Sequence, residues 1–111
     1  SSVDYKLAVE NIDRGVGLVI ETVKELDLFE HTYFILTSDH GHNAEGGDHS
    51  TSDSPVPFIV AGPGIKPGEI AQPVANNQVA QVAALLFDVP VSPDWTNSLF
   101  PFTRYFERVT K

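Results

Sequence analysis

Five Asp and His side chains, residue types that commonly bind metal ions, lie close together in one stretch of the chain. They are Asp39, His40, His42, Asp48 and His49. Gly41, Gly46 and Gly47 lie between them, and glycine lets a backbone bend tightly enough for separated ligands to converge. Imidazole nitrogens and carboxylate oxygens are the usual ligands of zinc and related divalent ions. The stretch therefore predicts a candidate metal site.

Residue types alone leave a second interpretation open. Asp and His in loops are also common as solvated turn residues whose side chains bond to the local backbone. The chain contains no cysteine, which excludes a disulfide framework, a thiolate zinc site and a cysteine nucleophile. Any metal ion must therefore be held by histidine and carboxylate side chains.

The elements on either side determine where this stretch lies. Apolar residues recur at spacings of three and four from Val9 to Leu26, which predicts an amphipathic helix over residues 3–27. The run Thr32–Thr37 is β-branched, aromatic and nearly continuously apolar. It predicts a central strand over residues 32–38, buried on both faces of a parallel sheet. Residues 38–55 then form an exposed loop at the carboxyl end of that strand, where open α/β sheets bind ligands.

The second half of the chain predicts one more strand and one more helix. The strand covers residues 56–61 and is followed by Gly-Pro turns. A short helix is expected over residues 77–87, capped by Asn76 or Asn77, with its inward side chains at Val79, Val82, Ala83 and Leu86. Aromatic residues of the tail are expected to pack onto the domain: Trp95, Phe100, Phe102, Tyr105 and Phe106. The predicted fold class is α/β, a single domain over residues 1–111 with a buried central strand and flanking helices.

Composition excludes several classes of function. The 111 residues carry seven Lys plus Arg and fifteen Asp plus Glu, a formal net charge of −8. This is the wrong sign for binding nucleic acid through its phosphates. No apolar run approaches the roughly 20 residues that span a bilayer, so no membrane segment is expected. His31 lies between the first helix and the first strand and is expected to have a surface or capping role.

An ordered set of motifs resembles a known group of enzymes. An apolar strand ends in Ser-Asp-His-Gly (residues 38–41), and a glycine-rich loop carries a further histidine. The run VPFIVAGPGIKPG follows over residues 56–68. Together these resemble the C-terminal metal loop of the alkaline phosphatase superfamily, which includes nucleotide pyrophosphatase/phosphodiesterases, phosphomutases and sulfatases. The resemblance implies a three-layer α/β/α sandwich and a two-metal site.

By that resemblance, Asp39 and His40 would ligate one metal ion and His49 the other. His42 and Asp48 would either orient the ligating imidazoles through hydrogen bonds or face solvent. The nucleophile and the remaining ligands of the family lie upstream of this motif, and nothing before Asp39 offers them. The sequence is therefore expected to be the C-terminal segment of a larger metal-dependent hydrolase. No catalytic nucleophile is assigned within it, and the isolated chain should be inactive.

The resemblance leads to a two-metal phosphoryl-transfer hydrolase of phosphate mono- or diesters or nucleotide anhydrides. Zinc is the expected ion, with manganese as the alternative; in the isolated chain binding should be weak or absent. A sulfatase is the near alternative, but sulfatases usually carry a lysine shortly after the loop histidine, and here the next one is Lys66. A phosphomutase and a non-catalytic α/β binding module are the other options.

The expected partners are a small phosphorylated substrate, the rest of the parent enzyme, and further copies of the segment by self-association. The resemblance favours a periplasmic or secreted location.

Overall fold

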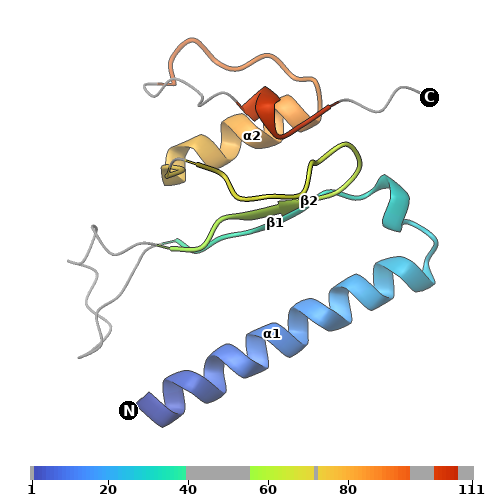
Figure 1. Cartoon of the computed structure of the whole chain (residues 1–111), viewed down its shortest axis with the longest axis vertical. Coiled ribbons are helices and arrows are strands. Elements are labelled where there is room, and N and C mark those ends of the chain that lie inside the picture. Colours follow the sequence, from blue (N-terminus) through green and yellow to red (C-terminus); the bar gives the residue numbers. More distant parts are fainter. Residues whose placement is uncertain (1, 40–55, 72, 96–101, 108–111) are drawn as a thin grey trace. The chain divides into compact units, whose positions relative to one another are not determined.

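The computed structural model describes residues 2–39, 56–71, 73–95 and 102–107 (Figure 1). The chain divides into two compact units, and each is described by itself. The first unit comprises residues 1–32 and 40–56, and the second comprises residues 33–39 and 57–111. The helices and strands, in order, are α1 (Ser2–Glu25), β1 (Phe34–Leu36), β2 (Ile59–Ala61) and α2 (Val79–Leu86), with short 3₁₀ helices η1 (Phe29–His31), η2 (Asn76–Gln78) and η3 (Phe102–Arg104).

Helix α1 confirms the predicted long helix of the first unit. Asp4 in its first turn and Lys24 in its last turn complement the helix dipole. The exposed pairs Lys6–Glu10 (4.0 Å) and Glu21–Lys24 (3.8 Å) lie at the spacings where helical side chains meet. Such pairs stabilise a helix by only about 0.2–0.5 kcal/mol each. The apolar periodicity is therefore the stronger reason for the helix, as most helical stability comes from packing of an apolar face.

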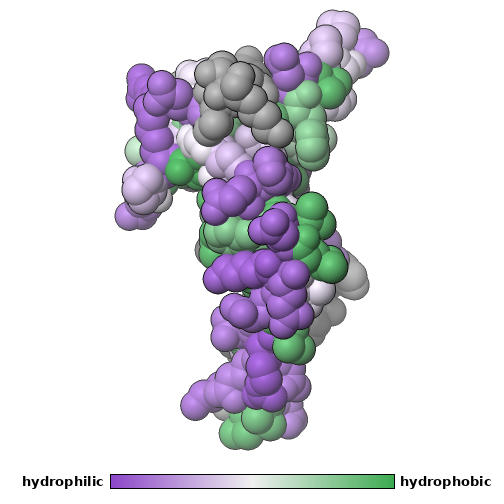
Figure 2. Space-filling view, turned by 90° about the vertical axis from the view of Figure 1, so that its right-hand side faces the viewer, coloured by the Kyte–Doolittle hydropathy of each residue, from purple (hydrophilic) through white to green (hydrophobic). Residues whose placement is uncertain are grey.

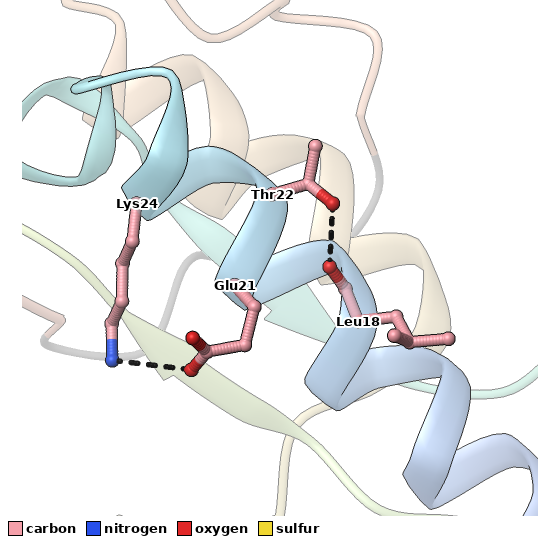
Figure 3. A network of polar contacts seen from close by, with 4 residues as sticks. All are labelled: Leu18, Glu21, Thr22 and Lys24. Carbon is pink, nitrogen blue, oxygen red and sulfur yellow. Dashed lines mark hydrogen bonds and ion pairs between the residues drawn. The ribbon is translucent and has the colours of Figure 1, made fainter.

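The last turns of α1 show why the helix ends two residues before the predicted position. Asp27 has a φ of 60°, the left-handed conformation that terminates many helices. The N–H of Leu28 donates to the carbonyl of Val23, and the N–H of Asp27 donates to that of Lys24. The N···O distance is 3.0 Å in each bond. These two bonds form a Schellman motif. Figure 3 shows the preceding turns, where the Thr22 hydroxyl donates to the Leu18 carbonyl over 2.8 Å.

The apolar stripe of α1 is largely exposed. Four of its six side chains are 48–63% exposed: Val9, Ile12, Val19 and Leu26. Val16 and Val23 are half-buried. Figure 2 shows hydrophobic residues beside hydrophilic ones on the surface of the face in view. The stripe that the sequence predicts is therefore present, and among the described residues it is largely exposed.

The strands of the second unit correct one prediction. β1 and β2 pair in antiparallel orientation, with Ile35 opposite Val60 at the centre of the register, and they form a two-stranded sheet (Figure 1). The prediction of a parallel, interior strand buried on both faces is therefore wrong for the described residues. Every residue of β1 is only half-buried.

The alternation of side chains explains the difference. Successive residues of a strand point to opposite faces. Ile35 and Val60 pack against the core of the second unit, whereas Ile59 and Ala61 of β2 are exposed. A continuous apolar run predicts a strand whose two faces are both apolar. It does not predict which other strand pairs with it, or whether that pairing is parallel or antiparallel.

The core of the second unit joins α2 to the tail. Its most buried side chains are Val82, Leu86, Phe102 and Phe106. The rings of Phe102 and Phe106 stack with centroids 5.9 Å apart, and Tyr33 meets Phe106 edge-on at 6.2 Å. Burying one such aromatic side chain contributes roughly 1.5–3 kcal/mol. The predicted packing of the tail is thus confirmed for Phe102, Tyr105 and Phe106; Phe100 lies outside the described residues, and Trp95 is partly exposed.

Helix α2 lies where the sequence predicts a helix, with two changes in detail. Val82 and Leu86 are buried as expected, but Val79 and Ala83 are only half-buried, and Gln81 and Ala84 take the other buried positions. The face of α2 that packs into the core is therefore shifted from the predicted one, toward Gln81 and Ala84.

A short segment of the tail is tied to the glycine-rich turn after β2. Ile65 and Phe106 form an antiparallel bridge. The N–H of Lys66 donates to the carbonyl of Tyr105, and the N–H of Glu107 donates to that of Gly64, each over 2.8 Å. Gly64 has a φ of 80°, which is readily reached only by glycine. The predicted Gly-Pro turn is therefore a docking point for the tail.

The structure thus has the mixed helix and strand content of an α/β fold. The three-layer sandwich stays a prediction, because the two units are described separately. In the part of the chain that the structure describes, no helix is both long and apolar enough to cross a bilayer.

Candidate metal centre

Asp39 lies just beyond the carboxyl end of β1, as the sequence predicts. The last paired residue of β1 is Leu36, opposite Ile59, so Thr37, Ser38 and Asp39 continue past the ladder. Asp39 is exposed, and its Oδ1 accepts a hydrogen bond from the Ser38 hydroxyl over 3.3 Å. An exposed carboxylate at the end of a strand is a suitable ligand for a divalent ion.

The backbone of Asp39 is held from the other side of the second unit. The side-chain amide of Asn76 donates from Nδ2 to the Asp39 carbonyl oxygen over 2.7 Å. Asn76 is the first residue of η2, directly before α2. The end of β1 is therefore bonded to the start of a helix that is anchored in the core.

The prediction of a helix cap at Asn76 or Asn77 is wrong. Ala75 is the N-cap of η2 and Gln78 is that of α2, and the N–H of Ala75 donates to Oε1 of Gln78 at a distance of 2.8 Å. The signal that was available is the glutamine three residues after the cap, because Glu or Gln at that position often reaches back to the cap N–H. Asn76 is thereby left to bond Asp39.

The other candidate ligands cannot be placed. His40, His42, Asp48 and His49 all lie outside the described residues. Within residues 2–39, 56–71, 73–95 and 102–107, no group of three or more His, Cys, Asp and Glu side chains is arranged to hold a metal ion. The assignment of Asp39, His40 and His49 as ligands therefore stays a prediction. The donor chemistry of Asp39, an exposed carboxylate with a restrained backbone, fits a divalent ion.

His31 and Lys66 are two basic side chains that the structure describes. His31 ends η1, and it is exposed, which confirms its predicted surface position. Lys66 follows β2, whose last residue, Ala61, pairs with Phe34 at the opposite end of β1 from Asp39. Because β1 and β2 are antiparallel, Lys66 and Asp39 continue from opposite ends of the strand pair.

Comparison with known proteins shows the family. The family model described as Sulfatase matches residues 4–89 of the 111-residue chain. The matched range includes α1 from residue 4 onward, both strands, the stretch that carries the candidate metal ligands, and α2. The chain belongs to the sulfatase family. The predicted membership of the alkaline phosphatase superfamily is thereby confirmed.

Individual relatives include two kinds of enzyme. The chain is 30% identical to a choline-sulfatase of Rhizobium meliloti over 94% of its own length and 22% of the relative's. It is 34% identical to a phosphopentomutase of Proteus mirabilis over 77% of its length and 20% of the relative's. An extracellular sulfatase of Drosophila melanogaster, a SULF-1 homolog, is 32% identical over 62% of the chain and 7% of the relative.

The chain therefore spans about a fifth of the length of the choline-sulfatase and the phosphopentomutase that it matches. No solved structure gives a significant match. The comparisons support a hydrolase or mutase of the alkaline phosphatase superfamily.

Proposed function

We propose that this chain is the C-terminal part of a metal-dependent phosphate-ester hydrolase, to which it contributes Asp39, His40 and His49 as metal ligands. The observation that carries the proposal is the position of Asp39 at the carboxyl end of β1, with its carboxylate exposed and its carbonyl bonded to Asn76. Membership of the sulfatase family supports the use of divalent metal ions. The single domain over residues 1–111 and the three-layer sandwich are part of the same proposal.

The roles of the residues follow from their chemistry. A pair of divalent ions stabilises the charge on the attacking and leaving oxygens during an in-line displacement. Asp39 would partly neutralise the positive charge of the ion that it binds. His40 and His49 would ligate through neutral imidazole nitrogens, so none of the three is a general base. His42 and Asp48 would orient those imidazoles or lie in solvent.

The position of the first lysine after His49 supports a phosphate ester rather than a sulfate ester as the substrate. The resemblance to sulfatases implies a lysine that reaches the sulfate from just after the loop histidine. Lys66 is the first lysine after His49, and it follows β2 at the end of the strand pair opposite Asp39. The similarity to a phosphopentomutase also supports a phosphorylated substrate.

A sulfatase is the second candidate, and one specific finding favours it. The family model that matches residues 4–89 is that of the sulfatases, and a choline-sulfatase is among the relatives. In that case the contact to the sulfate would have to come from a part of the enzyme other than Lys66.

An assay of the complete protein that contains this chain distinguishes the two. The purified protein is tested on p-nitrophenyl phosphate, bis-p-nitrophenyl phosphate and p-nitrophenyl sulfate, before and after metal removal by EDTA. We expect hydrolysis of a phosphate ester that is lost with EDTA and restored by zinc or manganese. Hydrolysis of the sulfate alone would establish the sulfatase, and an absence of turnover by folded, metal-loaded protein would contradict both.

The family also bears on location. We propose that the complete protein acts outside the cytoplasm, which the similarity to an extracellular sulfatase supports. Fractionation of cells that express the complete gene tests this proposal. Recovery of all the protein in the cytosol would contradict it.

A further inference from the structure

A hydrogen bond between two distant parts of the sequence fixes the backbone at Asp39. Nδ2 of Asn76 lies 2.7 Å from the carbonyl oxygen of Asp39, at the short end of the range for N–H···O bonds. The bond joins the end of β1 to the start of η2. It lies within the second unit, which contains both residues.

The base from which Asn76 reaches is rigid. Gln78, two residues on, is 9% exposed and accepts the N–H of Ala75 over 2.8 Å. Gln81 and Val82, in the first turn of α2, are almost fully buried. The position of Asn76 is therefore set by a helix start that packs into the core, and the amide presents its donor from a fixed point.

The part of the chain that Asn76 holds has no support from the sheet. Pairing with β2 ends at Leu36, so the strand no longer constrains residues 37–39. The Ser38 hydroxyl contacts Oδ1 of Asp39, but it belongs to the same segment. Asn76 ties this segment to η2, and it acts on the carbonyl group that directly follows the Asp39 Cα.

We propose that Asn76 is a positioning residue for Asp39: it fixes the peptide beyond the Asp39 Cα and so the direction in which the carboxylate meets a divalent ion. The proposal rests on the proposed function, in which Asp39 is a ligand. Asn76 itself touches neither metal nor substrate in this account. Its loss should weaken metal binding while leaving the fold intact, because its side chain is exposed.

The test compares matched variants of the complete protein. Asn76→Ser removes the amide but keeps a small polar side chain, and its hydroxyl is too short to reach the Asp39 carbonyl. Asn77→Ser makes the same change one position later and serves as the control. The readouts are the zinc Kd, from competition with a chromophoric chelator, and the melting temperature of the metal-free protein.

We expect Asn76→Ser to raise the zinc Kd by about 10- to 100-fold, the effect typical of residues that orient metal ligands. The metal-free melting temperature should match that of Asn77→Ser, whose Kd should stay at the wild-type value. Asn76→Leu, which has similar size and no donor, should reproduce the rise. Asn76→Gln, which keeps the amide, should recover part of the affinity.

A fourth variant separates this inference from the proposed function. Asp39→Asn should weaken zinc binding more than Asn76→Ser does. If Asp39→Asn weakens binding while both Asn76→Ser and Asn76→Leu bind as the wild type does, the positioning role is wrong and the metal site stands. If Asp39→Asn binds zinc as tightly as the wild type, the proposed function fails and this inference fails with it.

Discussion

At the scale of single residues, the account depends on a carboxylate that the fold presents to solvent. Asp39 follows β1 where pairing stops, and the Ser38 hydroxyl and the Asn76 amide contact its side chain and backbone respectively. Both contacts are hydrogen bonds donated to oxygen, and neither carries charge. An exposed carboxylate such as that of Asp39 is a suitable ligand for a divalent ion.

The first prediction concerns the three proposed ligands. In the complete protein, alanine at Asp39, His40 or His49 should each reduce metal-dependent hydrolysis by more than the roughly 100-fold upper range seen for residues that only orient ligands. His31→Ala is the control, because His31 is exposed at the end of η1. Initial rates with zinc in the buffer measure the effect. Full activity in any one of the ligand variants would remove that residue from the site.

A second prediction concerns Gly64, whose carbonyl accepts a hydrogen bond from the N–H of Glu107 in the tail. A Cβ on Gly64 would overlap the carbonyl group of Glu107, and its φ of 80° disfavours other residues. Gly64→Ala should therefore destabilise the protein by more than the roughly 1–3 kcal/mol that backbone strain costs. Gly68→Ala is the matched control, since Gly68 has a φ of 141° but no atom within 4 Å of the added Cβ.

Urea unfolding followed by circular dichroism measures the free energy of unfolding of each variant. We expect Gly68→Ala to be destabilised by backbone strain alone, and Gly64→Ala to be destabilised further by the steric overlap with Glu107. Equal stabilities of the two variants would mean that the tail does not lie against Gly64 in solution.

At the scale of elements, a substitution in α1 tests whether its surface at Gly15 is exposed to solvent. A Cβ added at Gly15 would meet no atom within 4 Å, and alanine is favoured over glycine in helices by about 1 kcal/mol. Gly15→Ala should therefore raise the free energy of unfolding by about 0.5–1 kcal/mol. Thermal unfolding followed at 222 nm measures it. A lower melting temperature would show that another element packs closely on α1 at this position.

The elements also show what sequence patterns can and cannot predict. The period of α1 was sufficient to predict a helix within two residues of its ends, because a single apolar stripe requires that geometry. The strand at residues 34–36 was predicted from its apolar run, but its antiparallel partner was not. Pairing direction depends on where the chain returns after residue 39, and no local pattern of Phe34, Ile35 and Leu36 contains that information.

The candidate site likewise has one feature that the sequence predicts and one that it does not. Asp39 at the end of a strand could be predicted, since the apolar run stops at Thr37 and polar residues follow at once. The bond from Asn76 could not, because it spans 37 positions in the sequence and exists only once β1 and α2 are packed in one unit. The cap at Ala75 was indicated only by Gln78, because alanine has no side-chain acceptor and the bond is accepted by the glutamine three residues later.

At the scale of the whole molecule, exposed apolar surface predicts association of the isolated chain. Leu18 is 67% exposed and Ile12 is 63% exposed on α1, and Phe87 is 72% exposed after α2. Apolar surface of this kind favours binding to another surface. The 111-residue chain alone should elute as oligomers whose mass rises with concentration in size-exclusion chromatography with light scattering. A monomer at every concentration tested would contradict this prediction.

The central claim is that this chain supplies only part of a two-metal centre. Three ligands divided between two ions leave two protein ligands for one ion and a single ligand for the other, whereas catalytic zinc sites generally use three plus water. The isolated chain should therefore hold metal weakly, and the complete protein should hold it tightly. The nucleophile is also expected outside these 111 residues.

The most direct measurement is a zinc titration of the 111-residue chain beside the complete protein, with phosphodiester hydrolysis assayed in both. We predict two tightly bound ions and turnover for the complete protein, and neither stoichiometric binding nor turnover for the isolated chain. Tight binding of one or two ions by the isolated chain, accompanied by turnover, would contradict the account and show that these residues form a complete active site.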